Sequence, residues 1–232
     1  MQSNFLPVYL ALREVWRNKG RFLMVGLVIA LITILVLFTA GLGEGLGNGN
    51  KEYISNLDGQ MLVYQQKSDF VIPASRVPRS ILTSIRRVEG VADAGLIATS
   101  SAAILLEDKP QPLKVSMLGV EPGRPGEPPV VQGRQLSGDL ANEVIIDRSV
   151  AVRSNIQLDD LITIRVTQGT QDEFYELRVV GISSGQQYSL QPSIFVPYFT
   201  WDRVRSKSEA EIAGGEYTAN TIIVKLQDPS QF

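Results

Sequence analysis

A long uncharged apolar run near the N-terminus constrains this chain more than any other feature. No charged residue lies between Phe22 and Phe38, and Leu31 stands near the middle of the run. Extended to Gly43, the run reaches the roughly 20 residues that a helix needs to cross a hydrocarbon core. The thirteen Leu, Ile, Val and Phe residues from Phe22 to Phe38 favour insertion by about 6 kcal/mol. The sequence therefore predicts a transmembrane helix over residues 22–43.

The charges on either side of the run predict its orientation. Basic residues precede it and only Glu14 opposes them, whereas the segment just after the run has a slight excess of negative charge. These basic residues are Arg13, Arg17, Lys19 and Arg21. Because positive residues stay in the cytoplasm, we expect the N-terminus inside and residues 44–232 outside. This orientation predicts a membrane protein with an extracytoplasmic domain.

A cleaved signal peptide is the alternative interpretation of the run. A signal peptide has an apolar stretch of about 7–15 residues followed by small residues at the cleavage site. Here the apolar stretch is longer, and the basic segment before it is unusually long for a signal peptide. Cleavage after Gly41 would place Thr39 three residues before the cut, which is a poor match. The sequence favours a retained span.

The composition excludes several classes of function. The sequence has no cysteine and no histidine, so zinc sites built from these residues, cysteine nucleophiles and histidine triads are excluded. The part after the span has 18 basic and 23 acidic residues and no basic stripe, which argues against nucleic-acid binding. We expect no catalytic residue, no cofactor and no metal ligand in this chain.

Two segments next to the span have predicted roles of their own. Residues 1–21 predict a basic amphipathic helix on the cytoplasmic side that contacts membrane lipid, with Trp16 at the depth of the headgroups. After the span, Gly45, Gly47 and Gly49 alternate with other residues. Because glycine weakens a helix, this segment predicts a hinge between the span and the outer domain.

The outer part alternates short strands with short helices and turn signals. The predicted strands are residues 61–65, 94–106, 113–120, 143–146, 161–167, 174–182, 193–196 and 220–227; the predicted helices are 75–88, 147–154 and 200–205; and residues 121–133, with four prolines, are a predicted loop. Asp147 is the expected N-cap of its helix. Without regular βαβ spacing, the pattern predicts an α+β domain of mixed strands and helices with two lobes.

Residues that could carry chemistry are few. The acidic pairs Asp159–Asp160 and Asp172–Glu173 stand at a strand entry and a turn, where acidic residues are ordinary. An aromatic cluster around Tyr198 and Trp201 is typical of a core or an interface. The sequence therefore favours a non-enzymatic protein.

Several motifs resemble those of ABC-transporter permeases of the macrolide-exporter and lipoprotein-release type. The stretches that carry the resemblance are Leu10–Leu23 before the span, Gly41–Gly45 after it, Val144–Ala151, Ile156–Ile164, Val179–Ile182, Ile194–Tyr198 and Asn220–Pro229. One departure is Asp159, which stands where the family usually has glycine, so we expect a different backbone form in that turn.

The resemblance implies a domain organisation and a mechanism. It implies a membrane-proximal lobe from residues 47–98 and 183–232, with an inserted lobe from residues 115–182. It also implies that the chain is the N-terminal portion of a longer permease, whose span relays the motion of a separate ATPase subunit to the outer domain.

The implied partners are the ABC ATPase, a second permease copy or paired permease, and a periplasmic adaptor or lipoprotein carrier. The alternative left open is a single-pass, membrane-anchored periplasmic binding or adaptor protein. A membrane-anchored hydrolase is disfavoured because histidine and cysteine are absent.

Overall fold

The computed structural model describes residues 13–14, 16–55, 57–68, 71–106, 109–184, 188, 191–208, 211 and 215–228, with side chains for all of these except residues 45–55. The chain divides into two compact units, Met1–Asn48 and Gly49–Phe232.

The apolar run is a helix, as the sequence predicts. Helix α2 (Lys19–Ser55) extends beyond the predicted span at both ends. Residues 13, 14, 16 and 17 are also helical, and a turn at Asn18 separates them from α2. The rest of the predicted amphipathic helix lies outside the described residues.

The second unit combines one large sheet with short helices. In chain order its elements are β1 (Met61–Val63), η1 (Ile72–Ala74), β2 (Val77–Pro78), α3 (Ser80–Ile85), β3 (Val91–Ile104), β4 (Leu113–Val120), β5 (Val130–Gly133), β6 (Glu143–Asp147), α4 (Arg148–Ser154), β7 (Leu161–Gln168), β8 (Gln171–Ser183), β9 (Ser193–Pro197), α5 (Tyr198–Val204), β10 (Thr218–Ala219) and β11 (Thr221–Leu226). The α+β class is confirmed.

Six strands of the sheet close into a ring. The described strands follow the order β1-β11-β3-β4-β9-β6-β8-β5, and β7 pairs with both β3 and β8. The step from β8 through β7 back to β3 completes the circle β3-β4-β9-β6-β8-β7. Closure removes the free edges that an open sheet would expose. Strands β1 and β11 extend the sheet from the first half of β3.

Alternating side chains fill the two faces of this sheet. Ile104 on β3 and Met117 on β4 belong to the larger core cluster, together with Ile164 on β7. Ile97 on β3 and Leu118 on β4 belong to a second cluster. Because successive strand residues point to opposite faces, the two clusters lie on opposite faces of the sheet.

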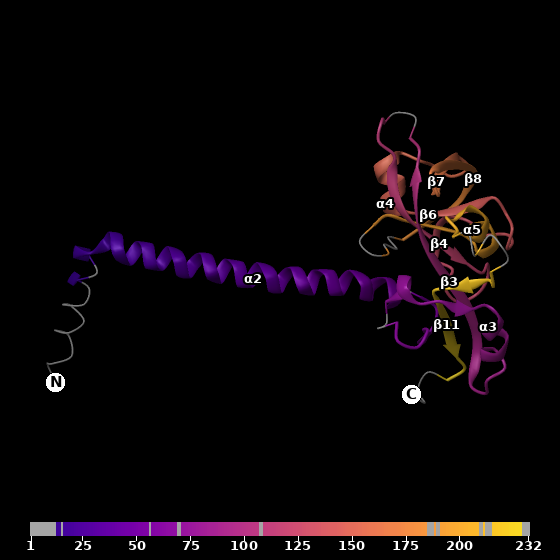
Figure 1. Cartoon of the computed structure of the whole chain (residues 1–232), viewed down its shortest axis with the longest axis horizontal. Coiled ribbons are helices and arrows are strands. Elements are labelled where there is room, and N and C mark those ends of the chain that lie inside the picture. The colour runs from indigo at the N-terminus through magenta and orange to yellow at the C-terminus, as the bar shows by residue number, and fades with distance from the viewer. Residues whose placement is uncertain are drawn as a thin grey trace. The chain divides into compact units, whose positions relative to one another are not determined.

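Strand β3 joins the two ends of the sheet. Figure 1 shows β11 and α3 beside one end of β3, and β7, β8 and α4 toward the other. Strand β9 lies between β4 and β6. The division into lobes of residues 47–98 with 183–232 and of residues 115–182 stays a prediction.

Two sequence predictions are wrong in part, and both errors come from pairing between distant segments. The helix predicted over residues 75–88 forms only as α3, because Val77 and Pro78 pair with β10. The loop predicted over residues 121–133 ends in β5, which pairs with β8. By contrast, the predicted cap of α4 is confirmed, since the Asp147 side chain accepts a hydrogen bond from the Ser149 amide.

The expectation of a different backbone form in the turn at Asp159 is wrong. Asp159 has a φ of 68°, which lies in the left-handed region that glycine favours. The amide of Asp159 donates to the Val179 carbonyl at 2.8 Å, so the turn is bonded to β8. The aspartate thus takes a backbone form that is usual for glycine.

Candidate functional site

The membrane-spanning candidate is the described part of α2 from Lys19 to Glu44. Its mean hydropathy reaches 2.9 and none of it is buried. Phe22, Leu31 and Phe38 are all exposed. The two threonines present no free hydroxyl donor, because Thr33 donates to the Ile29 carbonyl and Thr39 to that of Leu35, at 2.9 and 2.7 Å. A surface of this kind is suited to lipid, where every polar group must be satisfied internally.

The four basic residues gather at the start of this helix. Arg13 and Arg17 lie in the helical residues before the turn at Asn18, and Lys19 and Arg21 lie in the first turns of α2. All four are exposed. Local sequence therefore places them together at one end of the apolar surface.

The three glycines of the predicted hinge lie inside α2. Gly45, Gly47 and Gly49 follow the apolar part, and the helix continues through Ser55. A glycine in a helix interior costs roughly 0.5–1 kcal/mol relative to alanine. The glycine segment is accordingly the weakest part of α2 by propensity, and its role as a hinge stays a prediction.

In the second unit, a buried carboxylate fastens α3 to the sheet. Glu121 follows β4, and its side chain is only 7% exposed. One carboxylate oxygen pairs with Arg86 at 2.6 Å and the other with Arg79 at 3.4 Å. Arg86 also donates to the Ala94 carbonyl on β3 at 2.9 and 2.6 Å. Because Arg79 and Arg86 cap the two ends of α3, this contact holds the whole helix.

The same arginine connects α3 to the aromatic residues of α5. The Arg79 guanidinium lies 4.9 Å from the ring centre of Phe199 and 5.9 Å from that of Tyr198. The Tyr198 hydroxyl donates to the Thr218 carbonyl at 2.9 Å, and burial raises the pKa of this phenol. These aromatic side chains belong to a packed interior, as predicted for the cluster around Tyr198 and Trp201.

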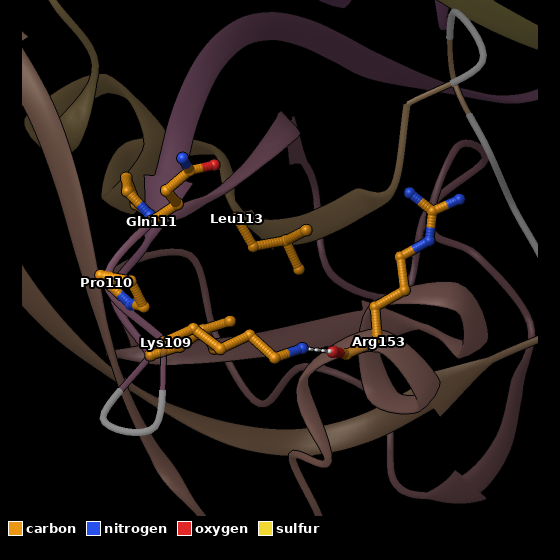
Figure 2. Close-up of a pocket in the computed structure, with 7 residues that line it drawn as sticks. Lys109, Pro110, Gln111, Leu113 and Arg153 are labelled. Carbon is orange, nitrogen blue, oxygen red and sulfur yellow. Dashed lines mark hydrogen bonds between the residues drawn. The ribbon is translucent and has the colours of Figure 1, made fainter.

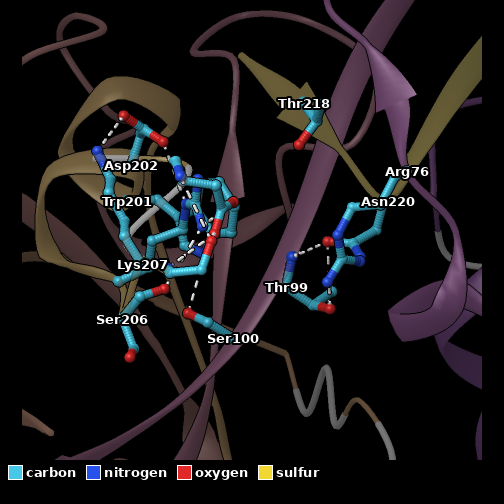
Figure 3. A network of polar contacts seen from close by, with 12 residues as sticks. Arg76, Thr99, Ser100, Trp201, Asp202, Ser206, Lys207, Thr218 and Asn220 are labelled. Carbon is cyan, nitrogen blue, oxygen red and sulfur yellow. Dashed lines mark hydrogen bonds and ion pairs between the residues drawn. The ribbon is translucent and has the colours of Figure 1, made fainter. Parts of the chain in front are cut away.

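Trp201 anchors α5 to the sheet. Its indole N–H donates to the Ser100 hydroxyl oxygen at 3.0 Å, and the Arg205 guanidinium lies 4.9 Å from its ring centre. Gly119 on β4 leaves the space for the indole, because a Cβ there would lie 2.6 Å from the Trp201 Cβ. Figure 3 shows the Trp201 side of this network. The helix can pack so closely only against a residue without a side chain.

Asn220 joins three segments that are far apart in sequence. Its side-chain oxygen accepts the Thr99 amide at 2.7 Å, while its nitrogen donates to the carbonyls of Ser75 and Pro73 at 3.1 and 3.4 Å. Figure 3 shows Asn220 beside Thr99. The amide side chain thereby links η1 and β3 to the start of β11.

An open cavity lies beside the β3–β4 hairpin. It measures about 690 Å³ and its walls include Lys109, Pro110, Leu113 and Arg153. Figure 2 shows the Lys109 ammonium donating to the Arg153 carbonyl, over 2.7 Å. Proline and leucine side chains next to two cations form a mixed surface that faces solvent.

The acidic pairs lie apart from these networks. Asp160 accepts the Gln157 amide at 2.7 Å, and Asp172 accepts the Thr167 hydroxyl at 2.8 Å. Both contacts stabilise local turns. Sequence reasoning missed Glu121 instead, and the only signal for it was its place directly after a buried strand.

A family model described as the MacB-like periplasmic core domain matches residues 22–232. The chain is similar to the periplasmic region of MacB from Actinobacillus actinomycetemcomitans, with 18% identity, a TM-score of 0.46 and 66% of each chain covered. It is also similar to the extracellular domain of the noncanonic ABC-type transporter YknZ from Gram-positive bacteria, with 15% identity, a TM-score of 0.49, and coverage of 73% of this chain and 84% of that chain. The match thus spans about two thirds of the MacB region's length.

Proposed function

The chain belongs to the family of the MacB-like periplasmic core domain, a domain of ABC-type transporter permeases, and from this premise we propose that it relays the motion of a cytoplasmic ATPase to an extracytoplasmic domain. The observation that carries the proposal is the direct succession of a helix fit to cross a membrane and a domain of this family. The chain itself performs no catalysis in this scheme, and ATP hydrolysis takes place on a partner subunit.

The proposed orientation places the basic residues in the cytoplasm. Arg13, Arg17, Lys19 and Arg21 precede the apolar surface, as cytoplasmic flanks do. The outer domain then lies on the far side of the bacterial inner membrane. Lipid contacts the exposed apolar surface of α2.

The relay passes through α2. A continuous helix transmits displacement along its axis, because its backbone hydrogen bonds couple each turn to the next. The glycine segment Gly45–Gly49 is the proposed point at which α2 bends or yields. The buried contacts of Glu121, Trp201 and Asn220 keep the outer domain cohesive, so that it responds as a unit.

The proposed partners follow the same scheme. An ABC ATPase meets the permease in the cytoplasm, and a second permease copy or a paired permease completes the membrane part. The open surface beside Lys109 and Arg153 is the proposed contact for a periplasmic adaptor or a lipoprotein carrier, since it offers apolar and charged groups together.

The relay is tested by a flexible insertion in the full complex. A Gly/Ser linker of about five residues behaves as a random coil, and we expect its insertion after Gly47 to disconnect the outer domain. Hydrogen exchange over residues 57–228 is measured with and without ATP. In the unmodified complex ATP changes this exchange; with the insertion the change is lost, while ATP hydrolysis persists.

The matched control places the same insertion after Gly169, at the tip of the β7–β8 hairpin. Nothing lies within 4 Å of a Cβ built at Gly169, so the control complex retains the ATP-dependent exchange. An unmodified complex without any ATP-dependent exchange, or a change that survives the insertion after Gly47, overturns the relay.

A further inference from the structure

A small cavity lies between α5 and the strands that meet at Asn220. It measures about 150 Å³ and its walls include Arg76, Thr99, Ser100, Arg205 and Asn220. In Figure 3, Trp201 and Ser100 lie on one side, and Arg76, Thr99 and Asn220 on the other. Pockets for drug-sized ligands measure about 300–1,000 Å³, so this cavity is suited to a single small group.

Three acceptors in or beside the cavity already have partners. The Asn220 side-chain oxygen accepts the Thr99 amide at 2.7 Å. The Thr218 carbonyl accepts the Tyr198 hydroxyl at 2.9 Å. The Ser75 carbonyl accepts from Asn220 at 3.1 Å. These three oxygens are therefore already engaged within the protein.

Donors, by contrast, are available. The Ser100 oxygen accepts the Trp201 N–H at 3.0 Å, which leaves the proton of the hydroxyl free to donate. The Arg76 guanidinium is held by one nitrogen, Nη1, which donates to the carbonyls of Pro73 and Ser75 at 2.8 and 2.9 Å. Its other nitrogens carry further N–H groups. The guanidinium is therefore positioned by the backbone and still has donors to offer.

The charges of the cavity leave one cation in excess. Arg205 pairs with Asp202 at 3.1 Å and with Glu211 at 2.9 Å, and Lys207 pairs with Asp202 at 2.8 Å. The Ser208 amide, with Arg205 as a further cause, lowers the pKa of Glu211 to about 2, so Glu211 is ionised at neutral pH. Within the described part of the chain, Arg76 makes no ion pair.

We propose that this cavity binds a small oxyanion, a carboxylate or phosphate group, between Arg76 and the Ser100 hydroxyl. Arg76 and Ser100 both line it and keep unused donors, and Arg76 is its one positive charge without an ion pair among the described residues. A guanidinium matches the two oxygens of such a group with parallel N–H bonds. The outer domain would thus bind an anionic group, and this proposal does not depend on the proposed relay.

The indole of Trp201 provides the readout, because it lines the cavity. The chain has two tryptophans, and Trp16→Phe leaves Trp201 as the sole emitter. The full chain in detergent micelles is titrated with sodium phosphate and, separately, with sodium acetate, with sodium chloride keeping the ionic strength constant. We expect a saturable change in Trp201 emission with at least one of them, and the pair of titrations distinguishes phosphate from carboxylate.

The variants test the assigned residues. Arg76→Gln is expected to weaken binding by about tenfold or more, because a charge-assisted bidentate contact is lost. Arg76→Lys keeps the charge but loses the forked guanidinium, so its affinity should lie between that of the parent chain and that of Arg76→Gln. Arg87→Gln removes an exposed arginine of the same segment and leaves binding unchanged. Thermal unfolding followed by circular dichroism confirms that each variant is folded.

Two results overturn the site. One is the absence of a saturable Trp201 response to both phosphate and acetate. The other is an affinity in folded Arg76→Gln or Arg76→Lys equal to that of the parent chain, which would place the anion elsewhere.

Discussion

Replacing Gly119 with alanine is expected to lower the free energy of unfolding by about 2–3 kcal/mol, the upper part of the range for overpacked cores. The added Cβ would lie 2.6 Å from both the Cβ and the Cγ of Trp201. The indole cannot withdraw without losing its bond to Ser100 at 3.0 Å and its contact with Arg205. Helix α5 must therefore shift away from β4. Denaturant unfolding followed by circular dichroism measures the loss.

The control for this substitution is Gly138→Ala. Nothing lies within 4 Å of a Cβ built at Gly138, so its unfolding free energy should stay within about 0.5 kcal/mol of the parent chain. If Gly119→Ala is as stable as Gly138→Ala, the close packing of α5 on the sheet is wrong.

Replacing Glu121 with alanine is expected to destabilise the outer domain by about 1.5–3 kcal/mol, the usual contribution of hydrogen bonds to a charged group, because the side chains of Arg86 and Arg79 are 29% and 36% exposed. Arg86 loses its contact at 2.6 Å and Arg79 its contact at 3.4 Å. Arg79 also has a buried Nε without a hydrogen-bond partner, so its charge is then left poorly compensated. Because both arginines cap α3, we expect the amides of this helix to exchange faster with solvent than in the parent chain.

Glu89→Ala serves as the matched control, since Glu89 is an exposed glutamate near the same helix. Unfolding in denaturant gives the stability of each variant, and hydrogen exchange resolves α3 itself. Equal stability and equal α3 exchange in the two variants would show that the Glu121 contacts do not hold the helix.

The elements that depend on neighbouring residues could be predicted from the sequence. The apolar run forms α2, and its own side chains are enough to predict a helix that spans a lipid bilayer. Asp147 caps α4 because a side-chain oxygen there can reach the Ser149 amide two residues on. The β7–β8 hairpin turns near Gly169, whose φ is 61°, between the strands predicted over residues 161–167 and 174–182.

The elements that depend on distant partners could not be predicted. Val77 and Pro78 belong to a helical pattern until β10 pairs with them. The closure of the ring depends on two residue pairs between β3 and β7, and no local pattern encodes them. Glu121 resembles a solvated loop residue beside proline, and its partners stand 35 and 42 positions away.

The proposed site residues divide in the same way. The basic flank, the span and the glycines are local features, so the sequence alone was enough to single them out. The cavity beside Arg76 needs η1, β3, α5 and β10 to come together. The sequence placed Trp201 in an aromatic cluster typical of a core or an interface and Asn220 in a stretch that resembles the permeases, and neither pattern indicated a cavity.

In the proposed topology α2 crosses the membrane once, with its basic flank in the cytoplasm and the sheet domain outside. The chain has no cysteine, so a single introduced thiol can be labelled without background. Leu140 is 67% exposed in the outer domain, and Ser3 precedes the basic flank. In cells whose inner membrane is intact, a membrane-impermeant maleimide should label Leu140→Cys directly, and Ser3→Cys only after that membrane is permeabilised. The reverse pattern, or labelling of both thiols before permeabilisation, would contradict this topology and the relay that depends on it.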